Sequence, residues 1–267
     1  MWNWGHLGIF FALSLLVCLC GFKKYVYFMS IGYGFSVAVI GVAMAVMSII
    51  GVYPAAGIAH YIQFALFLIY GFRLSGFLLI REIKNASYRK TLAEATGDES
   101  KMPIFVKVVM WLTMGVLYVA QTSGVAFRLF NGSSATVCQW IGIAISAFGI
   151  GLEAVADQQK SQQKAKRPDM VATEQLYKIV RCPNYFGEIL FWTGVTVSAL
   201  DILQGAGQWI TVIIAYILIV FIMFNGAQRL EKRQMARYGN NAEYKAYADK
   251  PPIIIPFLPV YHLNKQN

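Results

Sequence analysis

The residues best suited to chemistry lie between Tyr177 and Glu188, in the run Tyr-Lys-Ile-Val-Arg-Cys-Pro-Asn-Tyr-Phe-Gly-Glu. Pro183 can begin a helix, because its missing N–H costs nothing in a first turn. Asn184 and Glu188 would then share one face of that helix. Arg181 would stand just outside the N-terminus, where free N–H groups and the positive end of the helix dipole favour phosphate. A plain loop-to-helix transition would need neither Glu188 in an apolar helix nor Arg181 beside it, so the run predicts a site for an anion or cofactor.

Two acidic residues, Glu153 and Asp157, lie four positions apart near the end of an earlier apolar stretch. On a helix their like charges repel, so the pair needs cations or hydrogen-bond donors nearby. The alternative is that both carboxylates are solvated at the end of the helix. We favour a binding site, because a basic run follows that offers partners: Lys160, Lys164, Lys166 and Arg167.

Tyr70 and Arg73 are three positions apart, which places them on one helical face. One interpretation is that Arg73 extends its guanidinium toward the membrane surface while its stem stays in the apolar layer. The other is that Arg73 contacts an anion or cofactor and that Tyr70 donates a proton nearby. The residues alone leave both open.

The C-terminal tail holds a further group of cations. Arg229 and Arg233 share a helical face after the last apolar stretch and suit a second phosphate contact. A lipid-facing role is equally open, because basic residues bind anionic lipid headgroups and aromatic residues form belts at membrane interfaces. The remaining tail residues of interest are Asn225, Glu231, Lys232, Tyr238, Tyr244, Tyr247 and the run 251–257.

The elements that must position these residues are membrane helices. The chain is 57% hydrophobic and 13% charged, too apolar for a water-soluble core, and its long continuous apolar runs favour helices over a barrel. The net charge of +10 does not predict a nucleic-acid binder, because the basic residues fall between apolar stretches. The four cysteines and three histidines show no ligand spacing, so we expect no metal site and no disulfide framework.

We therefore predict an all-α integral membrane protein with seven spans. On this count nearly all of the 23 Lys and Arg residues fall on one side, and Arg128 alone lies on the other. The positive-inside rule then places the N-terminus outside and the C-terminus in the cytoplasm. The N-terminal stretch is read as a retained span, and the membrane would be the cytoplasmic (inner) membrane in a bacterium. The predicted spans are about 4–22, 29–52, 58–80, 104–122, 135–155, 185–202 and 209–227.

The chain resembles the DUF1295 group of membrane proteins, which is related to steroid 5-alpha-reductases. The resemblance covers most of the chain and rests on Gly-Leu-Glu-Ala-Val-Ala-Asp157, on Tyr177…Arg181-Cys-Pro-Asn-Tyr-Phe-Gly-Glu188, and on Leu-Glu-Lys-Arg…Tyr244…Tyr247…Pro256-Phe257. The segments Tyr70-x-x-Arg73 and Arg81…Tyr88-Arg89 also match. Two positions depart: Cys182 stands where the bacterial family usually has His, and the first two spans lack the Gln-Glu pair of steroid reductases.

The resemblance implies one seven-helix domain over residues 1–267, with spans one to three in 1–103 and a cofactor-binding half in 104–267. It implies an NADPH-dependent reductase acting in lipid metabolism on the C=C bond of a hydrophobic enone, steroid-like or another lipid, that enters from the bilayer. Tyr70 and Glu188 would be catalytic, with Tyr70 the proton donor. Asn184 and Glu188 would hold the nicotinamide end. The other cofactor-binding residues would be Arg73, Glu153, Asp157, Lys164, Tyr177, Arg181, Tyr185, Arg229, Arg233 and Tyr244.

Two other functions compete with the reductase. Isoprenylcysteine carboxyl methyltransferases carry a similar Arg-His-Pro-x-Tyr run and a similar Glu…Tyr-x-x-Tyr tail, and they use S-adenosylmethionine. Asn184 after the proline and the pair Gly187-Glu188 favour the reductase pattern. A transporter or lipid-binding protein is disfavoured, because Arg73, Glu153 and Glu188 all lie toward cytoplasmic span ends and no inverted repeat is evident.

Overall fold

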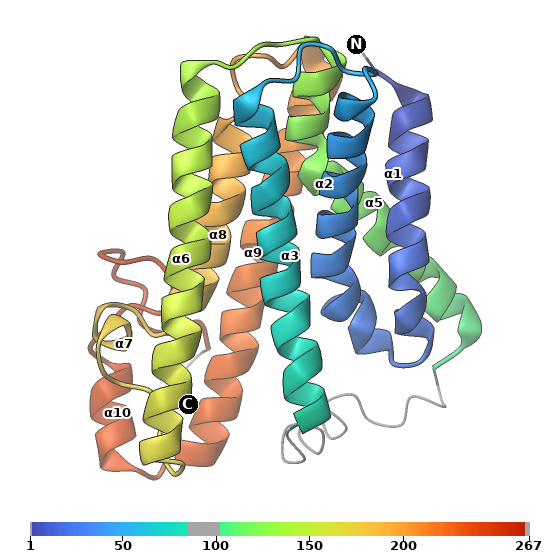
Figure 1. Cartoon of the computed structure of the whole chain (residues 1–267). Coiled ribbons are helices and arrows are strands. Elements are labelled where there is room, and N and C mark those ends of the chain that lie inside the picture. The colour runs from blue at the N-terminus through green and yellow to red at the C-terminus, as the bar shows by residue number, and fades with distance from the viewer. Residues whose placement is uncertain (1, 85–101, 265–267) are drawn as a thin grey trace. The chain divides into compact units, whose positions relative to one another are not determined.

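The computed structural model describes residues 2–84 and 102–264, and within them the chain forms helices and no strand (Figure 1). Tyr88 and Arg89, which match the family motif, lie outside the described residues, as do the basic residues Lys90 and Lys101. Among the described residues, six helical segments are long and apolar enough to cross a membrane, which supports a multi-pass membrane protein. These segments are Trp4–Phe22, Tyr25–Ile49, Ile58–Lys84, Ile104–Phe130, Val137–Lys166 and Gly205–Tyr238.

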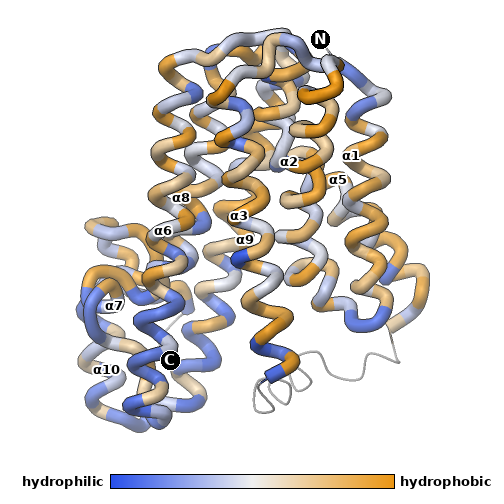
Figure 2. The backbone as a smooth tube through the Cα atoms, in the orientation of Figure 1, coloured by the Kyte–Doolittle hydropathy of each residue, from blue (hydrophilic) through white to orange (hydrophobic). Residues whose placement is uncertain are grey.

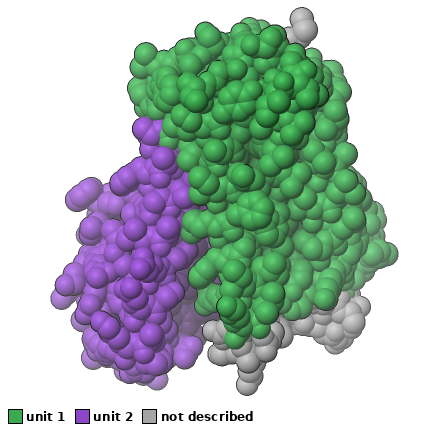
Figure 3. Space-filling view, viewed as in Figure 1, with its two compact units in different colours: residues 1–143, 195–215 green, residues 144–194, 216–267 purple. Residues whose placement is uncertain are grey.

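The chain divides into two compact units, each described by itself (Figure 3). Unit 1 comprises Met1–Ile143 and Val195–Ala215, and unit 2 comprises Ala144–Gly194 and Tyr216–Asn267. The predicted halves, 1–103 and 104–267, follow the order of the chain instead and stay a prediction.

Unit 1 is built around a pair of closely packed helices, α2 and α3. A Cβ atom at Gly34 of α2 would lie 2.8 Å from the Gly71 carbonyl oxygen of α3, so the two backbones touch there. Beside this contact the ring of Tyr33 stacks on Tyr118 and meets Tyr70 edge to face, with centroid distances of 5.1 and 5.9 Å. The elements of unit 1 are α1 (Trp4–Val17), η1 (Cys18–Phe22), η2 (Tyr25–Phe28), α2 (Ile31–Ile49), α3 (Ile58–Lys84), α5 (Ile104–Phe130), the first residues of α6 (Val137–Lys166) and part of α9 (Gly205–Tyr238).

Unit 2 contains most of the predicted site residues. It holds α7 (Leu176–Ile179), α10 (Ala242–Ala248), most of α6, α8 (Pro183–Val197) and α9, and the tail to residue 264. Within this unit the apolar parts of α6 and α9 give way to hydrophilic C-terminal ends, and α10 carries both hydrophilic and hydrophobic residues (Figure 2). The last turns of α6 and α9, together with α7, α10 and the tail, therefore form a polar cap. The apolar parts of the two long helices lie before this cap.

The count of seven spans stays a prediction, because α8, which overlaps the predicted sixth span, has only 15 residues. A helix of that length rises about 22 Å, less than the roughly 30 Å of a bilayer's hydrocarbon core. The predicted orientation is likewise untested.

Several helices extend well past the predicted spans, because hydropathy marks where a chain leaves the membrane and not where a helix ends. Helix α9 continues to Tyr238, and α6 continues to Lys166. Helix α5 continues to Phe130, so Arg128, which the sequence placed in a loop, lies in the last turn of a helix and is fully buried.

Candidate functional site

The first turn of α8 begins at Pro183, as the sequence predicted, and the C-terminal tail holds the residues just before it. The backbone N–H groups of Arg181 and Cys182 donate to the carbonyl oxygens of Pro252 and Ile253, each at 2.9 Å. Val180, with φ −153° and ψ 143°, is extended. A short extended pairing with the tail thus precedes the helix and fixes where it starts.

Helix α8 packs against α6 through two glycines in unit 2. A Cβ atom at Gly187 would lie 2.6 Å from Glu153 Cγ and 2.8 Å from the Gly149 carbonyl oxygen. Only a residue without a side chain fits such a contact. The contact brings the α6 and α8 segments that carry Glu153 and Glu188 against each other.

The two carboxylates are almost wholly enclosed. Glu153 is 2% exposed and Glu188 is 4% exposed, and the indole N–H of Trp192 donates to Glu188 Oε1 at 3.2 Å. Asn184 stands one turn before Glu188 and is half-buried, and Asp157 stands one turn after Glu153 and is also half-buried. Each helix therefore pairs an enclosed acid with a polar group, one turn away, that solvent can reach.

Arg181, predicted to contact phosphate, is used differently. Its Nη2 donates to Glu231 Oε1 at 2.7 Å, with both side chains 3% exposed, and also to the carbonyl oxygen of Tyr261. Its Nε is buried and has no hydrogen-bond partner among the described residues. Arg181 therefore ties the start of α8 to α9 and to the tail, and its role toward a cofactor stays a prediction.

Glu231 is the residue that the sequence reasoning undervalued. Besides Arg181 it accepts hydrogen bonds from His262 Nδ1 at 2.9 Å, from the backbone N–H groups of Leu263 and Asn264 at 2.9 and 3.0 Å, and from Asn264 Nδ2 at 2.8 Å. The other ring nitrogen of His262 lies 2.9 Å from Asp249 Oδ1. Glu231 thus holds the last described residues of the chain onto α9.

Lys164, another predicted cofactor contact, closes the loop after α6. Its Nζ donates to the carbonyl oxygens of Pro168 and Met170, both at 2.7 Å, and to Tyr238 Oη at 3.1 Å. The first residue after α6, Arg167, forms an exposed two-bond pair with Glu243 at 2.7 and 2.8 Å. The hydrogen bonds from Arg167 hold the pKa of Glu243 below its ordinary value.

The predicted tyrosines Tyr177 and Tyr244 are packing residues of the polar cap. Tyr177 is 3% exposed and donates to the Ala156 carbonyl oxygen at 3.2 Å, and its own carbonyl oxygen accepts from Tyr247 Oη at 2.8 Å. Tyr244 is fully buried against Met170, and its hydroxyl has no hydrogen-bond partner in residues 2–84 and 102–264. Burial raises the pKa of all three phenols, so they stay protonated.

The remaining predicted residues divide between the units. In unit 2, Arg229 and Arg233 are exposed on α9, and Tyr185 is half-buried, its ring 3.4 Å from where a Cβ at Gly226 would lie. In unit 1, Tyr70 is fully buried and Arg73 is half-buried. Because each unit is described by itself, the union of Tyr70 and Arg73 with the unit 2 residues in one site stays a prediction.

Arg128 is a second polar centre that the sequence reasoning missed. Within unit 1 its guanidinium donates to Asp201 Oδ1 at 2.7 Å, to Thr136 Oγ1 at 3.1 Å, and to the carbonyl oxygens of Ser134 and Ser198. The sequence did contain a signal for this centre, because Arg128 is the one basic residue predicted to lie on the side opposite the others. No group of three potential metal ligands occurs within the part of the chain that the structure describes.

An all-helical membrane protein with buried carboxylates beside a proline-initiated helix is the class that this fold and site define. The chain belongs to a family described as "Protein of unknown function (DUF1295)", whose model matches residues 22–251. This match confirms the family assignment made from the motifs. No curated protein and no solved structure matches the chain.

Proposed function

We propose that this protein is a membrane-embedded reductase that uses NADPH to reduce the C=C bond of a hydrophobic enone. The observation that carries the proposal is the enclosure of Glu153 and Glu188 in a unit built of apolar helices, at 2% and 4% exposure. Ionisable groups in such surroundings are costly and mark functional sites in membrane proteins. A purely structural helix pair would pack as well with apolar residues at both positions.

The polar groups around these acids suit the parts of a dinucleotide. The amide of Asn184 and the carboxylate of Glu188 supply an acceptor and donors for a carboxamide such as that of nicotinamide. The exposed guanidinium groups of Arg229 and Arg233 suit phosphates. The buried Nε of Arg181, which has no partner in the described residues, is one further donor.

NADPH, when bound, supplies a hydride to the β-carbon of the enone. The chain's own contribution is to hold the cofactor and the substrate and to donate a hydrogen bond. A hydroxyl such as that of Tyr70 would donate to the enone oxygen and stabilise the enolate that forms, an interaction worth a few kcal/mol in a water-excluded site. The apolar helices exclude water and admit the substrate from the bilayer. The proton that completes the product comes to the α-carbon from solvent.

Titration of the purified full chain with NADPH and with S-adenosylmethionine tests the proposal. We expect NADPH to bind, and Asn184→Ala and Glu188→Gln to weaken it about tenfold or more, the loss expected for a buried polar contact. Glu243→Gln, which removes an exposed acid of the same unit, is the matched control and should leave binding unchanged. Binding of S-adenosylmethionine alone would overturn the reductase and favour the methyltransferase.

A further inference from the structure

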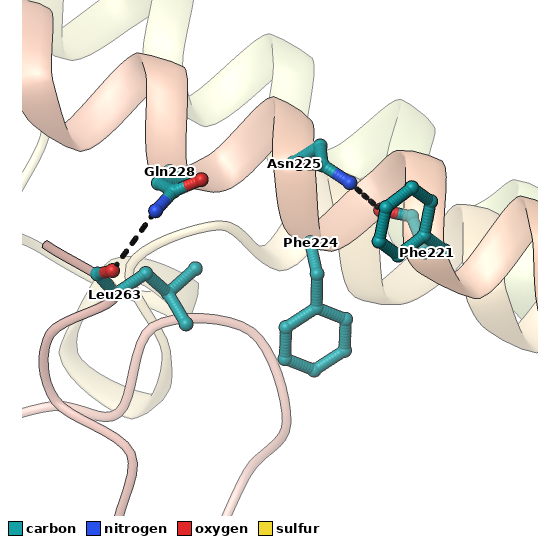
Figure 4. Close-up of a pocket in the computed structure, with 5 residues that line it drawn as sticks. All are labelled: Phe221, Phe224, Asn225, Gln228 and Leu263. Carbon is teal, nitrogen blue, oxygen red and sulfur yellow. Dashed lines mark hydrogen bonds between the residues drawn. The ribbon is translucent and has the colours of Figure 1, made fainter.

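A hollow in the surface of unit 2 has an uneven chemical lining. It lies between α9 and the C-terminal tail and is lined by Phe221, Phe224, Asn225, Gln228 and Leu263 (Figure 4). The two rings and the leucine give it an apolar wall, and the two amides give it a polar one. Phe221 is 63% exposed, so a large ring stands open at its edge.

The tail wall of the hollow is fixed by hydrogen bonds. Gln228 Nε2 donates to the Leu263 carbonyl oxygen at 3.1 Å, and the Leu263 N–H donates to Glu231 Oε2 at 2.9 Å. Asn264 Nδ2 donates a hydrogen bond to the Gln228 carbonyl oxygen at 3.0 Å. Leu263 is thereby held against α9, and the hollow is a built feature of the unit.

The lining follows an order along one face of α9. Ile217, Phe221, Asn225, Gln228 and Lys232 are spaced by three or four residues, so they lie in one line along the helix. Ile217 is 58% exposed and lies in the apolar part of a candidate span, where lipid is the solvent. Going toward the helix end, the line passes from an apolar chain, through a ring and two amides, to the exposed cation of Lys232.

We propose that this hollow binds one membrane phospholipid. A phospholipid presents the same order of chemistry along its length: hydrocarbon, then ester oxygens, then phosphate. The side-chain amide of Asn225 donates one hydrogen bond to the Phe221 carbonyl oxygen, and that of Gln228 donates one to the Leu263 carbonyl oxygen. Each amide has a second N–H, which can donate to an ester oxygen. Lys232 would meet the phosphate, as basic residues at membrane surfaces do. The site is independent of the reductase proposal.

The test is a titration of the delipidated full chain in detergent with an anionic phospholipid, phosphatidylglycerol, followed by native mass spectrometry. We expect one lipid to be retained by the native chain, and Lys232→Glu to weaken binding about five- to tenfold. Lys245→Glu, the same change at an exposed lysine of α10, is the matched control and should change binding less than about twofold. Equal losses in the two variants would show a general charge effect and overturn the site.

A second variant separates the lipid chain from its headgroup. Phe221→Asn alters an exposed ring, so it should leave the fold intact. It should weaken the binding of phosphatidylglycerol by several-fold. Unchanged binding in Phe221→Asn would show that no acyl chain lies in the hollow and would overturn the proposal. Inorganic phosphate should fail to displace the lipid. Full displacement by phosphate alone would mean a simple anion site and would also overturn it.

Discussion

Arg181 and Glu231 form an ion pair 2.7 Å long in which both side chains are 3% exposed, and this pair joins the start of α8 to α9. Removal of one partner from a buried pair leaves the other charge without compensation, at a cost of about 3–5 kcal/mol. Glu231 also accepts four hydrogen bonds from the last described residues. Its substitution should therefore release the tail as well as the arginine.

We predict that Glu231→Gln lowers the free energy of unfolding by about 3 kcal/mol or more in detergent. Thermal unfolding measures the loss of stability. Limited proteolysis after residue 249 measures the release of the tail. Glu243→Gln breaks the exposed pair with Arg167 and should lower the free energy of unfolding far less, because solvent screens such pairs. Equal stabilities of the two variants would mean that the Arg181–Glu231 pair does not hold the tail.

Gly187 gives a sharper prediction for the contact between α6 and α8. Gly187→Ala would place a Cβ atom 2.8 Å from the Gly149 carbonyl oxygen, which is backbone and cannot turn aside. Overpacking of this kind costs about 1–3 kcal/mol. Thermal unfolding of the variant should show that loss, together with weaker NADPH binding if the carboxylates form the proposed site.

The matched control for Gly187 is Gly151, which lies on α6. Apart from its own stretch of helix, no atom of the described residues lies within 4 Å of a Cβ added there. Alanine favours a helix over glycine by up to about 1 kcal/mol, so Gly151→Ala should leave stability unchanged or raise it. A destabilised Gly151→Ala variant, or an unaffected Gly187→Ala variant, would contradict the close contact between α6 and α8.

The pair of Arg167 and Glu243 predicts a local dependence on pH. Its hydrogen bonds hold the pKa of Glu243 below its ordinary value, so whatever the pair contributes is present above the ordinary pKa of a glutamate and is lost as the pH falls through the lowered one. In Arg167→Gln the pKa of Glu243 should rise back toward its ordinary value. Carboxyl NMR of selectively labelled glutamate measures the pKa of Glu243 in the native chain and in Arg167→Gln. The same pKa in the two proteins would exclude the pair in solution.

Some of this site could be predicted from the sequence, and the reason is local. Proline is well suited to begin a helix, and glycine four residues later allows a helix to approach closely, so the start of α8 and the contact at Gly187 follow from residue types alone. The burial of Glu188 follows from its place in an apolar stretch. These features depend on neighbours within a turn or two.

The rest depends on residues far apart in the chain. Arg181 meets Glu231 across 50 positions and Arg128 meets Asp201 across 73, and nothing in the local pattern chooses those partners. The same holds for Lys164, whose ammonium closes its own loop and also reaches Tyr238. The partners of these cations are set by tertiary packing.

Cys182 gives the last prediction, because it lies between Arg181 and the first turn of α8. Burial raises the pKa of its thiol to about 11, although the nearby charges of Lys160 and Arg181 act in the other direction. The thiolate is the reactive form, so Cys182 should resist maleimide at neutral pH. Its backbone N–H is also tied to Ile253, which keeps the tail over it.

The measurement is the rate of maleimide labelling at Cys182, read by peptide mass spectrometry. Gln158→Cys, at an exposed position of α6, supplies a reactive reference in the same unit. We expect Cys182 to label at least about a hundredfold more slowly, since the thiolate fraction falls tenfold for each pKa unit and burial slows access further. In Glu231→Gln, where the tail is released, Cys182 should become reactive. Fast labelling of Cys182 in the native chain would show that the tail does not cover the start of α8.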